Sequence, residues 1–220
     1  MAEKKLQDPH LPSGEIVATH DDDATLDEGQ VRRNDGVVLN PAARNPWYVL
    51  ATVAGEKETT DPVGPDDDLA VRNRRFWNGW ACAGMDENRA ALAEKLGLPP
   101  EELAPLSEAE RETLEAEFAR RLRPDVPIPD PSDMIDCMQT HFPHTVLWRK
   151  CAFPARADFY SATFSGSASF HSASFSGSAN FRSATFSDST VFRSATFSGG
   201  AHFEFATFSR LLKNLAWTGI

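Results

Sequence analysis

Phenylalanine recurs along the last third of the chain at a period that is neither helical nor strictly alternating. From Phe153 to Phe208 the steps between successive phenylalanines alternate between six and five positions, so two steps together make one repeating unit. A small residue, usually alanine, stands two positions before each phenylalanine. Because residues at i and i+2 share one side of an extended strand, this pattern predicts short strands that bury both side chains.

The same pattern continues upstream of Phe153. Phe142 lies one repeating unit earlier, Trp148 divides that interval, and Cys137 lies one five-position step before Phe142. With these, 14 successive segments keep one spacing, so we expect a repetitive domain over residues 133–210. The predicted inward aromatic side chains are Trp148, Phe153, Phe159, Phe164, Phe170, Phe175, Phe181, Phe186, Phe192, Phe197, Phe203 and Phe208.

An eleven-residue period, the sum of the two steps, is also typical of right-handed coiled coils, but the residue types exclude a helix here. A helical repeat places apolar residues three and four apart, whereas these are two and five apart. The positions between them hold Ser, Thr and Gly, which are poor helix formers. Short strands joined at small-residue corners instead predict a solenoid, in which each turn covers the core of the next.

The segments ATFSG, ASFHS, ASFSG, ANFRS and ATFSD resemble the pentapeptide-repeat family, whose unit is Ala, a variable residue, a central Leu or Phe, and two variable residues. The resemblance covers about residues 133–209. It implies a mainly β fold, a right-handed, four-sided parallel β-helix with one segment per side. The central aromatic residue and the preceding alanine would line its interior.

This sequence departs from the family's simplest form by inserting a sixth residue in every second segment, such as Ser167, Ser178 and Ser189. We therefore expect wider alternate corners and about 22 residues per turn. The alternative is a flattened, two-sided coil that closes after one repeating unit. In that coil the phenylalanine rings from facing strands would share a very narrow interior.

The N-terminal part of the chain has a different character. Residues 1–44 are polar and acidic, and they carry little apolar surface to offset the entropy of ordering, so we expect a disordered acidic segment. The run Asp21, Asp22, Asp23 is interpreted as a solvated tail; a metal-binding loop is the alternative, although the spacing matches no calcium loop.

Residues 45–132 are expected to form a small, mostly helical region that caps the solenoid. Two helices are predicted, over residues 86–98 and 107–123, the first ended by Gly97. The second begins with the capping-box pair Ser107 and Glu110. Its predicted buried face is Leu114, Phe118 and Leu122. The aromatic residues Trp47, Tyr48, Phe76, Trp77 and Trp80 are predicted to pack together.

Charge divides the chain near the start of the repeats. Residues 1–150 hold 29 acidic and 17 basic side chains, whereas residues 151–220 hold 3 and 5. The three cysteines, Cys82, Cys137 and Cys151, have no CxxC spacing, so we expect no disulfide framework. With no signal peptide at the N-terminus and no apolar run long enough for a membrane helix, the sequence indicates a soluble cytoplasmic protein.

No catalytic, metal-binding or cofactor-binding pattern is found, so we do not expect an enzyme or a cofactor. His141 and His144 with Cys137 and Cys151 form the one zinc-like set, but both cysteines fall at inward repeat positions. The arginines among the aromatic residues at 70–84 lie in acidic surroundings, so we expect no nucleic-acid partner.

The solenoid is therefore expected to be a protein-interaction or scaffold module with an unidentified protein partner. Alternate segments differ: one type is nearly uniform in Thr and Ser around its phenylalanine, and the other is variable. Specific recognition would use the variable type. The candidate interaction face is Tyr160, His171, Arg182, Arg193 and Glu204.

Two alternative functions, and one expectation for the C-terminus, follow from other features. Some pentapeptide-repeat proteins imitate DNA and protect a type II topoisomerase, but this requires a strongly negative rod, and the repeats here are near neutral. Ice or lattice binding would use the Thr and Ser columns, spaced by about 4.8 Å. The C-terminal segment 211–220 abandons the repeat, and it is expected to form a lid or a homodimer contact.

Overall fold

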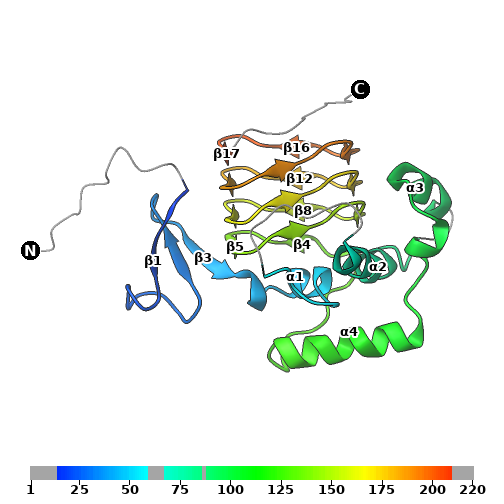
Figure 1. Cartoon of the computed structure of the whole chain (residues 1–220), viewed down its shortest axis with the longest axis horizontal. Helices are drawn as coiled ribbons and strands as arrows, with labels where there is room; N and C mark the ends of the chain where they lie inside the picture. The colour runs from blue at the N-terminus through cyan, green and yellow to red at the C-terminus, as the bar shows by residue number, and fades with distance from the viewer. Residues whose placement is uncertain (1–13, 59–66, 86–87, 210–220) are drawn as a thin grey trace, which may run out of the picture.

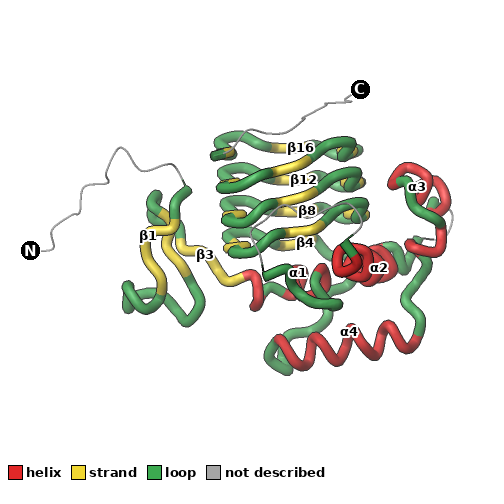
Figure 2. Tube along the Cα trace, viewed as in Figure 1, coloured by secondary structure: helices red, strands yellow, loops and turns green. Residues whose placement is uncertain are grey.

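The computed structural model describes residues 14–58, 67–85 and 88–209. A β-solenoid forms the centre of the molecule, with helices gathered at its first turn and an N-terminal β-sheet extension standing at one side (Figure 1). The short strands of the solenoid are separated by turns along its whole length (Figure 2). No helix among the described residues is both long enough and apolar enough to cross a membrane.

The strands of the solenoid form four stacks of parallel, hydrogen-bonded strands. The β4 stack contains β4 (Ile135–Asp136), β8 (Ala157–Asp158), β12 (Ala179–Asn180) and β16 (Ala201–His202). The β5 stack contains β5 (Thr140–Phe142), β9 (Thr163–Phe164), β13 (Thr185–Phe186) and β17 (Thr207–Phe208). The β6 stack contains β6 (Val146–Leu147), β10 (Ala168–Ser169) and β14 (Thr190–Val191). The β7 stack contains β7 (Ala152–Phe153), β11 (Ser174–Phe175) and β15 (Thr196–Phe197).

The pairing fixes the length of one turn. Ala157 pairs with Ala179, which pairs with Ala201, and Thr163, Thr185 and Thr207 follow the same 22-residue step. One turn therefore takes four segments, or two repeating units, as the insertions predict. The two-sided coil is excluded, because no strand among the described pairs is bonded to a partner only one repeating unit away.

Phenylalanine rings fill the interior in columns that run along the solenoid. Each inward ring lies parallel to the ring one turn later; the Phe170 and Phe192 centroids are 4.7 Å apart, and those of Phe159 and Phe181 are 4.8 Å apart. The inward aromatic side chains from Trp148 to Phe192 are buried. Phe197, Phe203 and Phe208 are partly buried and pack against the same cluster.

The alternation of five- and six-position steps corresponds to two kinds of corner. One kind holds a non-glycine residue with φ between 47° and 61°, at every eleventh position. These residues are Gln139, Lys150, Ser161, Ser172, Ser183, Ser194 and Phe205. Left-handed backbone costs a residue other than glycine about 1 kcal/mol, so the tight corner is maintained by the stacked strands on either side.

Residues 14–44 are ordered, so the prediction of disorder is wrong for this part; residues 1–13 lie outside the described residues. β1 (Ile16–Thr19), β2 (Val31–Arg33) and β3 (Val38–Pro41) pair antiparallel in succession, and β3 pairs parallel with β5 of the solenoid. The ordering entropy is offset by burial of Leu26, Val31 and Leu39 and by this shared sheet. The solenoid partner is distant in sequence, which is why local composition was misleading.

Helical segments occupy residues 42–121. They are η1 (Ala42–Arg44), α1 (Pro46–Ala51), α2 (Asp68–Ala81), α3 (Arg89–Leu96), η2 (Pro100–Leu103) and α4 (Glu108–Arg121). The capping box of Ser107 and Glu110 is confirmed, and Gly97 ends α3 with φ of 61°. Leu114, Phe118 and Leu122 are buried as predicted.

The cap on the first turn is made chiefly by α1 and α2, not by the two helices predicted from the sequence. Tyr48 of α1 meets the Phe142 ring at 5.5 Å, and Trp77 of α2 meets Phe153 at 5.2 Å. The Trp77 indole also donates to the Ala152 carbonyl at 2.7 Å. The aromatic residues at 47–80 therefore belong to one continuous core with the repeats.

The outer helices occupy different places. α4 packs against α1, where the Arg121 guanidinium donates to the Thr52 carbonyl at 3.0 Å. α3 lies beside the solenoid, where the Lys150 ammonium donates to the Gly97 carbonyl at 2.7 Å. Neither arrangement was specified by the helical pattern, which indicates a buried face but not its partner.

Candidate functional site

The uniform β5 stack is covered by the chain's own N-terminal extension. Arg33 of β2 reaches across two turns: its Nη1 donates to the Ser161 and Ser183 carbonyls at 3.5 and 3.2 Å, and to the Thr163 and Thr185 hydroxyls at 3.4 and 3.3 Å. Both threonines are buried. The extension stands directly beside this stack (Figure 1).

Replacing Arg33 with methionine is expected to loosen the extension and leave the solenoid folded. The Arg33 side chain is 3% exposed, and its other two nitrogens hold the Asp35 carboxylate at 2.9 and 2.6 Å. Without the guanidinium, those acceptors lose their donor, at a cost of about 1–3 kcal/mol. Hydrogen exchange of residues 16–41 should then accelerate at least about fivefold, with the amides of β9 and β13 unchanged.

The same replacement at Arg44 provides the matched control, because that side chain is 54% exposed. Equal acceleration in both variants would contradict the role of Arg33.

The contact between Arg33 and Asp35 also depends on pH. The Arg33 hydrogen bond lowers the pKa of Asp35, so its contribution is complete above the usual carboxyl pKa of about 3.9 and is lost as the pH falls through the lowered value.

The uniform β7 stack is also covered in part, by α2 and α3. The Asn78 side chain accepts from the Ala152 amide at 2.8 Å and donates to the Lys150 carbonyl at 3.0 Å. Lys95 of α3 donates to the Ser198 hydroxyl at 3.3 Å. Ala152 and Ser174 are buried, so the lower part of this stack offers no free row of hydroxyl groups within the described residues.

The two variable stacks carry the predicted interaction residues, but these do not form one face. Tyr160, Arg182 and Glu204 follow successive strands of the β4 stack, one per turn. His171 and Arg193 follow strands of the β6 stack. Along the chain a uniform stack separates the β4 and β6 stacks in both directions, so the five residues divide between two surfaces.

The outer side chains of the β4 stack change from apolar to charged along the solenoid. Met138 and Tyr160 are exposed apolar side chains on the first two turns, and Arg182 and Glu204 form a charged pair on the next two. Arg182 donates to both Glu204 carboxylate oxygens at 3.0 Å. This pairing, chiefly its hydrogen bonds, lowers the pKa of Glu204 to about 2. We call the row Met138, Tyr160, Arg182 and Glu204 the mixed row.

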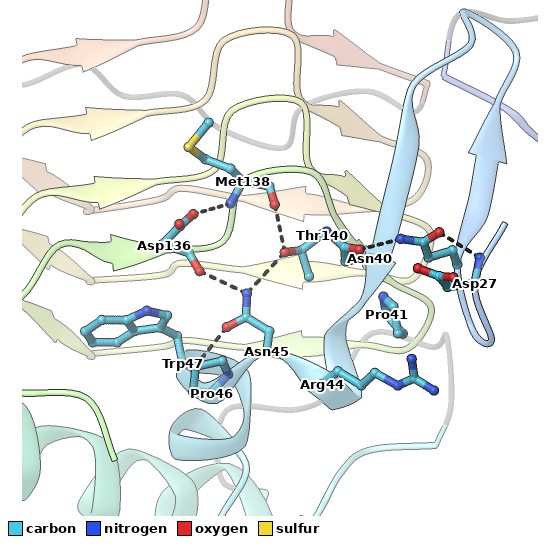
Figure 3. A pocket seen from close by; sticks show the side chains of 11 residues that line it. Asp27, Asn40, Pro41, Arg44, Asn45, Pro46, Trp47, Asp136, Met138 and Thr140 are labelled. Atoms are coloured by element: carbon cyan, nitrogen blue, oxygen red, sulfur yellow. Dashed lines mark hydrogen bonds between the residues drawn. The ribbon is translucent and has the colours of Figure 1, made fainter. Parts of the chain in front are cut away.

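A cavity of about 420 Å³ opens at the foot of the mixed row (Figure 3). It is bounded by the segment before β2, by η1 and the start of α1, and by the first turn of the solenoid. Its lining residues are Asp27, Gln30, Asn40, Pro41, Arg44, Asn45, Pro46, Trp47, Asp136, Met138 and Thr140. Met138 therefore belongs to both the cavity and the mixed row.

Asn45 organises the centre of this cavity. Its side-chain oxygen accepts from the Trp47 amide at 2.9 Å and so begins α1, while its amide nitrogen donates to the Asp136 carbonyl at 2.9 Å and to the Thr140 hydroxyl at 3.2 Å. The pair Asn45 and Pro46 is a helix-start signal that the sequence contains. The sequence pattern did not predict that Asn45 contacts the solenoid, and it did not predict the cavity. Part of the cavity wall comes from residues that were expected to be disordered.

The alternative metal sites are occupied by ordinary structural contacts. Asp22 accepts from Thr19, and Asp23 from Thr25 and Arg32, so the acidic run forms turns. His141 shares a hydrogen bond with the Ser165 hydroxyl at 2.9 Å, and burial lowers its pKa to about 4. Among the described residues no group of three His, Cys, Asp or Glu side chains could hold a metal ion.

The predicted inward cysteines lie in the core. Cys137 and Cys151 are buried, and burial raises the pKa of both thiols. All three cysteines are free. The segment 211–220, predicted as a lid or dimer contact, lies outside the described residues.

Comparison with known proteins bears on the repeats alone. Residues 170–211 match the family model for pentapeptide repeats (9 copies). No curated protein and no solved structure matches the chain. The matched residues contain the phenylalanine columns and the 22-residue step described above. Residues 170–211 of this chain are therefore pentapeptide repeats.

Proposed function

We propose that the chain is a non-catalytic protein-interaction module that binds a protein partner through the β4 stack. The supporting observation is which stacks the chain itself covers. The N-terminal extension covers the β5 stack and helices cover part of the β7 stack, whereas the mixed row of the β4 stack is exposed. Exposed apolar side chains beside polar ones are typical of protein-binding surfaces. A pentapeptide-repeat solenoid is a repeat-protein fold suited to such a role.

We also infer that the solenoid is a right-handed, four-sided β-helix. Four strand stacks and a 22-residue step support four sides, and right-handed connections dominate between parallel strands of one sheet. On this geometry the β4 and β6 stacks face away from each other, which would allow two partners at once.

The mixed row and the cavity offer complementary chemistry for a polypeptide segment. Met138 and Tyr160 supply apolar contact area, the tyrosine at low entropic cost, and Asn40 supplies an amide group at the cavity. Arg182 and Glu204, bound to each other, can exchange that pairing for a partner's charges. A segment with an apolar anchor followed by charged side chains would match the order of these groups along the mixed row.

The two other functions have less support. DNA mimicry requires a strongly negative surface, yet the repeats carry few acidic side chains, and Arg182 neutralises Glu204. Ice binding requires a free, flat array of hydroxyl groups, yet Thr163, Thr185 and Ser174 are buried.

A photocrosslinker at residue 160 tests the proposal. Replacing Tyr160 with p-benzoylphenylalanine should capture a discrete polypeptide from lysate of the source cells, and adding Met138→Asp should reduce that capture at least about tenfold. The matched control places the crosslinker at Glu112, an exposed position on α4. Capture of the same species at both positions, or of none at residue 160, would overturn the proposal.

A further inference from the structure

The outer side of the β6 stack carries two parallel rows of side chains. The strands pair in register, so the first row is Leu147, Ser169 and Val191. Two positions later, in the turn that follows each strand, the second row is Arg149, His171 and Arg193. Hydrogen bonds from the Lys150 amide to the His171 carbonyl and from the Ser172 amide to the Arg193 carbonyl keep that row aligned. We call it the basic row.

The charge of the basic row is not balanced locally. Among the described residues no carboxylate lies within ion-pair distance of Arg149 or Arg193, in contrast to Arg182 of the β4 stack, which holds Glu204. Asp188, at the corner before β14, accepts from the Ser189 amide. The pKa of His171 is lowered by its partial burial and then by the charges of Arg149, Arg193 and Lys150.

Lys150 does not belong to the free part of this surface. Its ammonium donates to the Gly97 carbonyl at the end of α3, at 2.7 Å, and so holds α3 in place. The two arginines and the imidazole between them remain as the groups that a ligand can meet.

The neighbouring row adds an apolar requirement. Leu147 and Val191 are half-buried at the strand ends, and Arg149 and Arg193 follow two positions later. The residues between them, Trp148 and Phe192, are buried in the core, so both rows lie on its outer side. A ligand that covers both rows must therefore present carboxylates along one line and apolar side chains along the next.

The spacing selects a helix. Successive turns lie about 4.8 Å apart, so Arg149 and Arg193 are separated by about 9.6 Å along the stack. A helix rises about 1.5 Å per residue, so its positions i and i+7 are about 10.5 Å apart, with i+3 and i+4 between them. In an extended strand, residues on the same side are about 6.8 Å apart, so their spacing does not match the separation of about 9.6 Å between the two arginines.

We propose that the β6 stack docks an amphipathic α-helix of a partner protein, with an acidic stripe on the basic row and an apolar stripe on Leu147 and Val191. Nucleic acid fits less well, because only two arginines are available and the chain carries a net charge of −10, which repels a long polyanion. This docking surface does not depend on the use of the β4 stack.

Fluorescence anisotropy with two peptides tests the inference on the full chain. One labelled peptide of about 15 residues places glutamates at i, i+4, i+7 and i+11 beside a leucine stripe, and the other has the same composition with the glutamates dispersed around the helix. We expect the striped peptide to bind at least about fivefold more tightly. Changing Arg149→Gln and Arg193→Gln together should weaken it about tenfold.

Arg123→Gln is the matched control, since it removes a like charge from an 85% exposed side chain that follows α4, and it should leave the affinity unchanged. Equal binding of both peptides, or an equal loss with Arg123→Gln, would overturn the inference. So would tighter binding of a single-stranded oligonucleotide or of phosphatidylserine vesicles. Thermal unfolding of each variant checks that the fold is retained.

The two proposals can fail separately. Capture by the crosslinker at residue 160 without selective peptide binding would overturn only the helix-docking inference. Selective peptide binding without that capture would overturn only the proposal for the β4 stack.

Discussion

Replacing Phe170 with alanine is expected to lower the free energy of unfolding by about 3–5 kcal/mol. The Phe170 ring is fully buried and stacks on Phe192 at 4.7 Å, with Trp148 5.4 Å away on the preceding turn. Alanine removes the ring from the middle of a column and leaves a cavity that the stacked strands cannot collapse around. Chemical denaturation followed by circular dichroism measures the loss.

Phe205→Ala provides the matched control, because this side chain is 89% exposed and makes no ring contact within the described residues. Its expected change is within about 0.5 kcal/mol. If Phe170→Ala and Phe205→Ala changed stability equally, stacking and burial along the columns would not be what stabilises the solenoid.

The repetitive half of the fold could be predicted because each segment repeats the same local chemistry. A small or apolar residue, usually alanine, and an inward residue, usually phenylalanine, stand two apart in each of 14 segments, and this spacing indicates which residues are buried. The sixth residue inserted in every second segment also recurs in each repeating unit, so it predicted a turn of 22 residues. In a solenoid each turn contacts only its neighbours, so local pattern and global structure agree.

The N-terminal half could not be predicted in the same way, because its contacts are long-range. Arg33 is a charged residue in a polar stretch, and only the distant carbonyl groups of Ser161 and Ser183 explain its burial. Asn45 likewise begins a helix and reaches the first turn. Local composition predicts surface for both residues, and tertiary hydrogen bonds reverse that prediction.

The interaction residues were predicted from the variable segments, and in the structure they lie on two stacks. Variable segments do carry the exposed side chains, as with Tyr160 and Arg193. Their separation into two stacks follows from the four-segment turn, which places alternate variable segments on different stacks. The proposed function is based on the cover over the uniform stacks. That cover depends on the N-terminal extension and on α3, and the repeat pattern of the sequence does not indicate it.

Replacing Asn78 with alanine is expected to cost about 2–4 kcal/mol, because two main-chain groups of the solenoid lose their partners. The Asn78 side chain is fully buried at the join between α2 and the first turn. It accepts from the Ala152 amide at 2.8 Å and donates to the Lys150 carbonyl at 3.0 Å. Thermal unfolding should shift downward, and hydrogen exchange at the Ala152 amide should accelerate more than at Phe186, which lies further along the solenoid.

Asn88→Ala is the matched control for this change, since Asn88 is exposed and makes no side-chain capping bond to α3. The comparison separates the role of the cap from the general effect of removing an asparagine. An uncovered first turn would expose the main-chain groups of its strands to other chains. The variant at Asn78 should therefore also aggregate at concentrations where wild type does not. Equal stability and equal light scattering for both variants would mean that aromatic packing by Tyr48 and Trp77 suffices to close the solenoid.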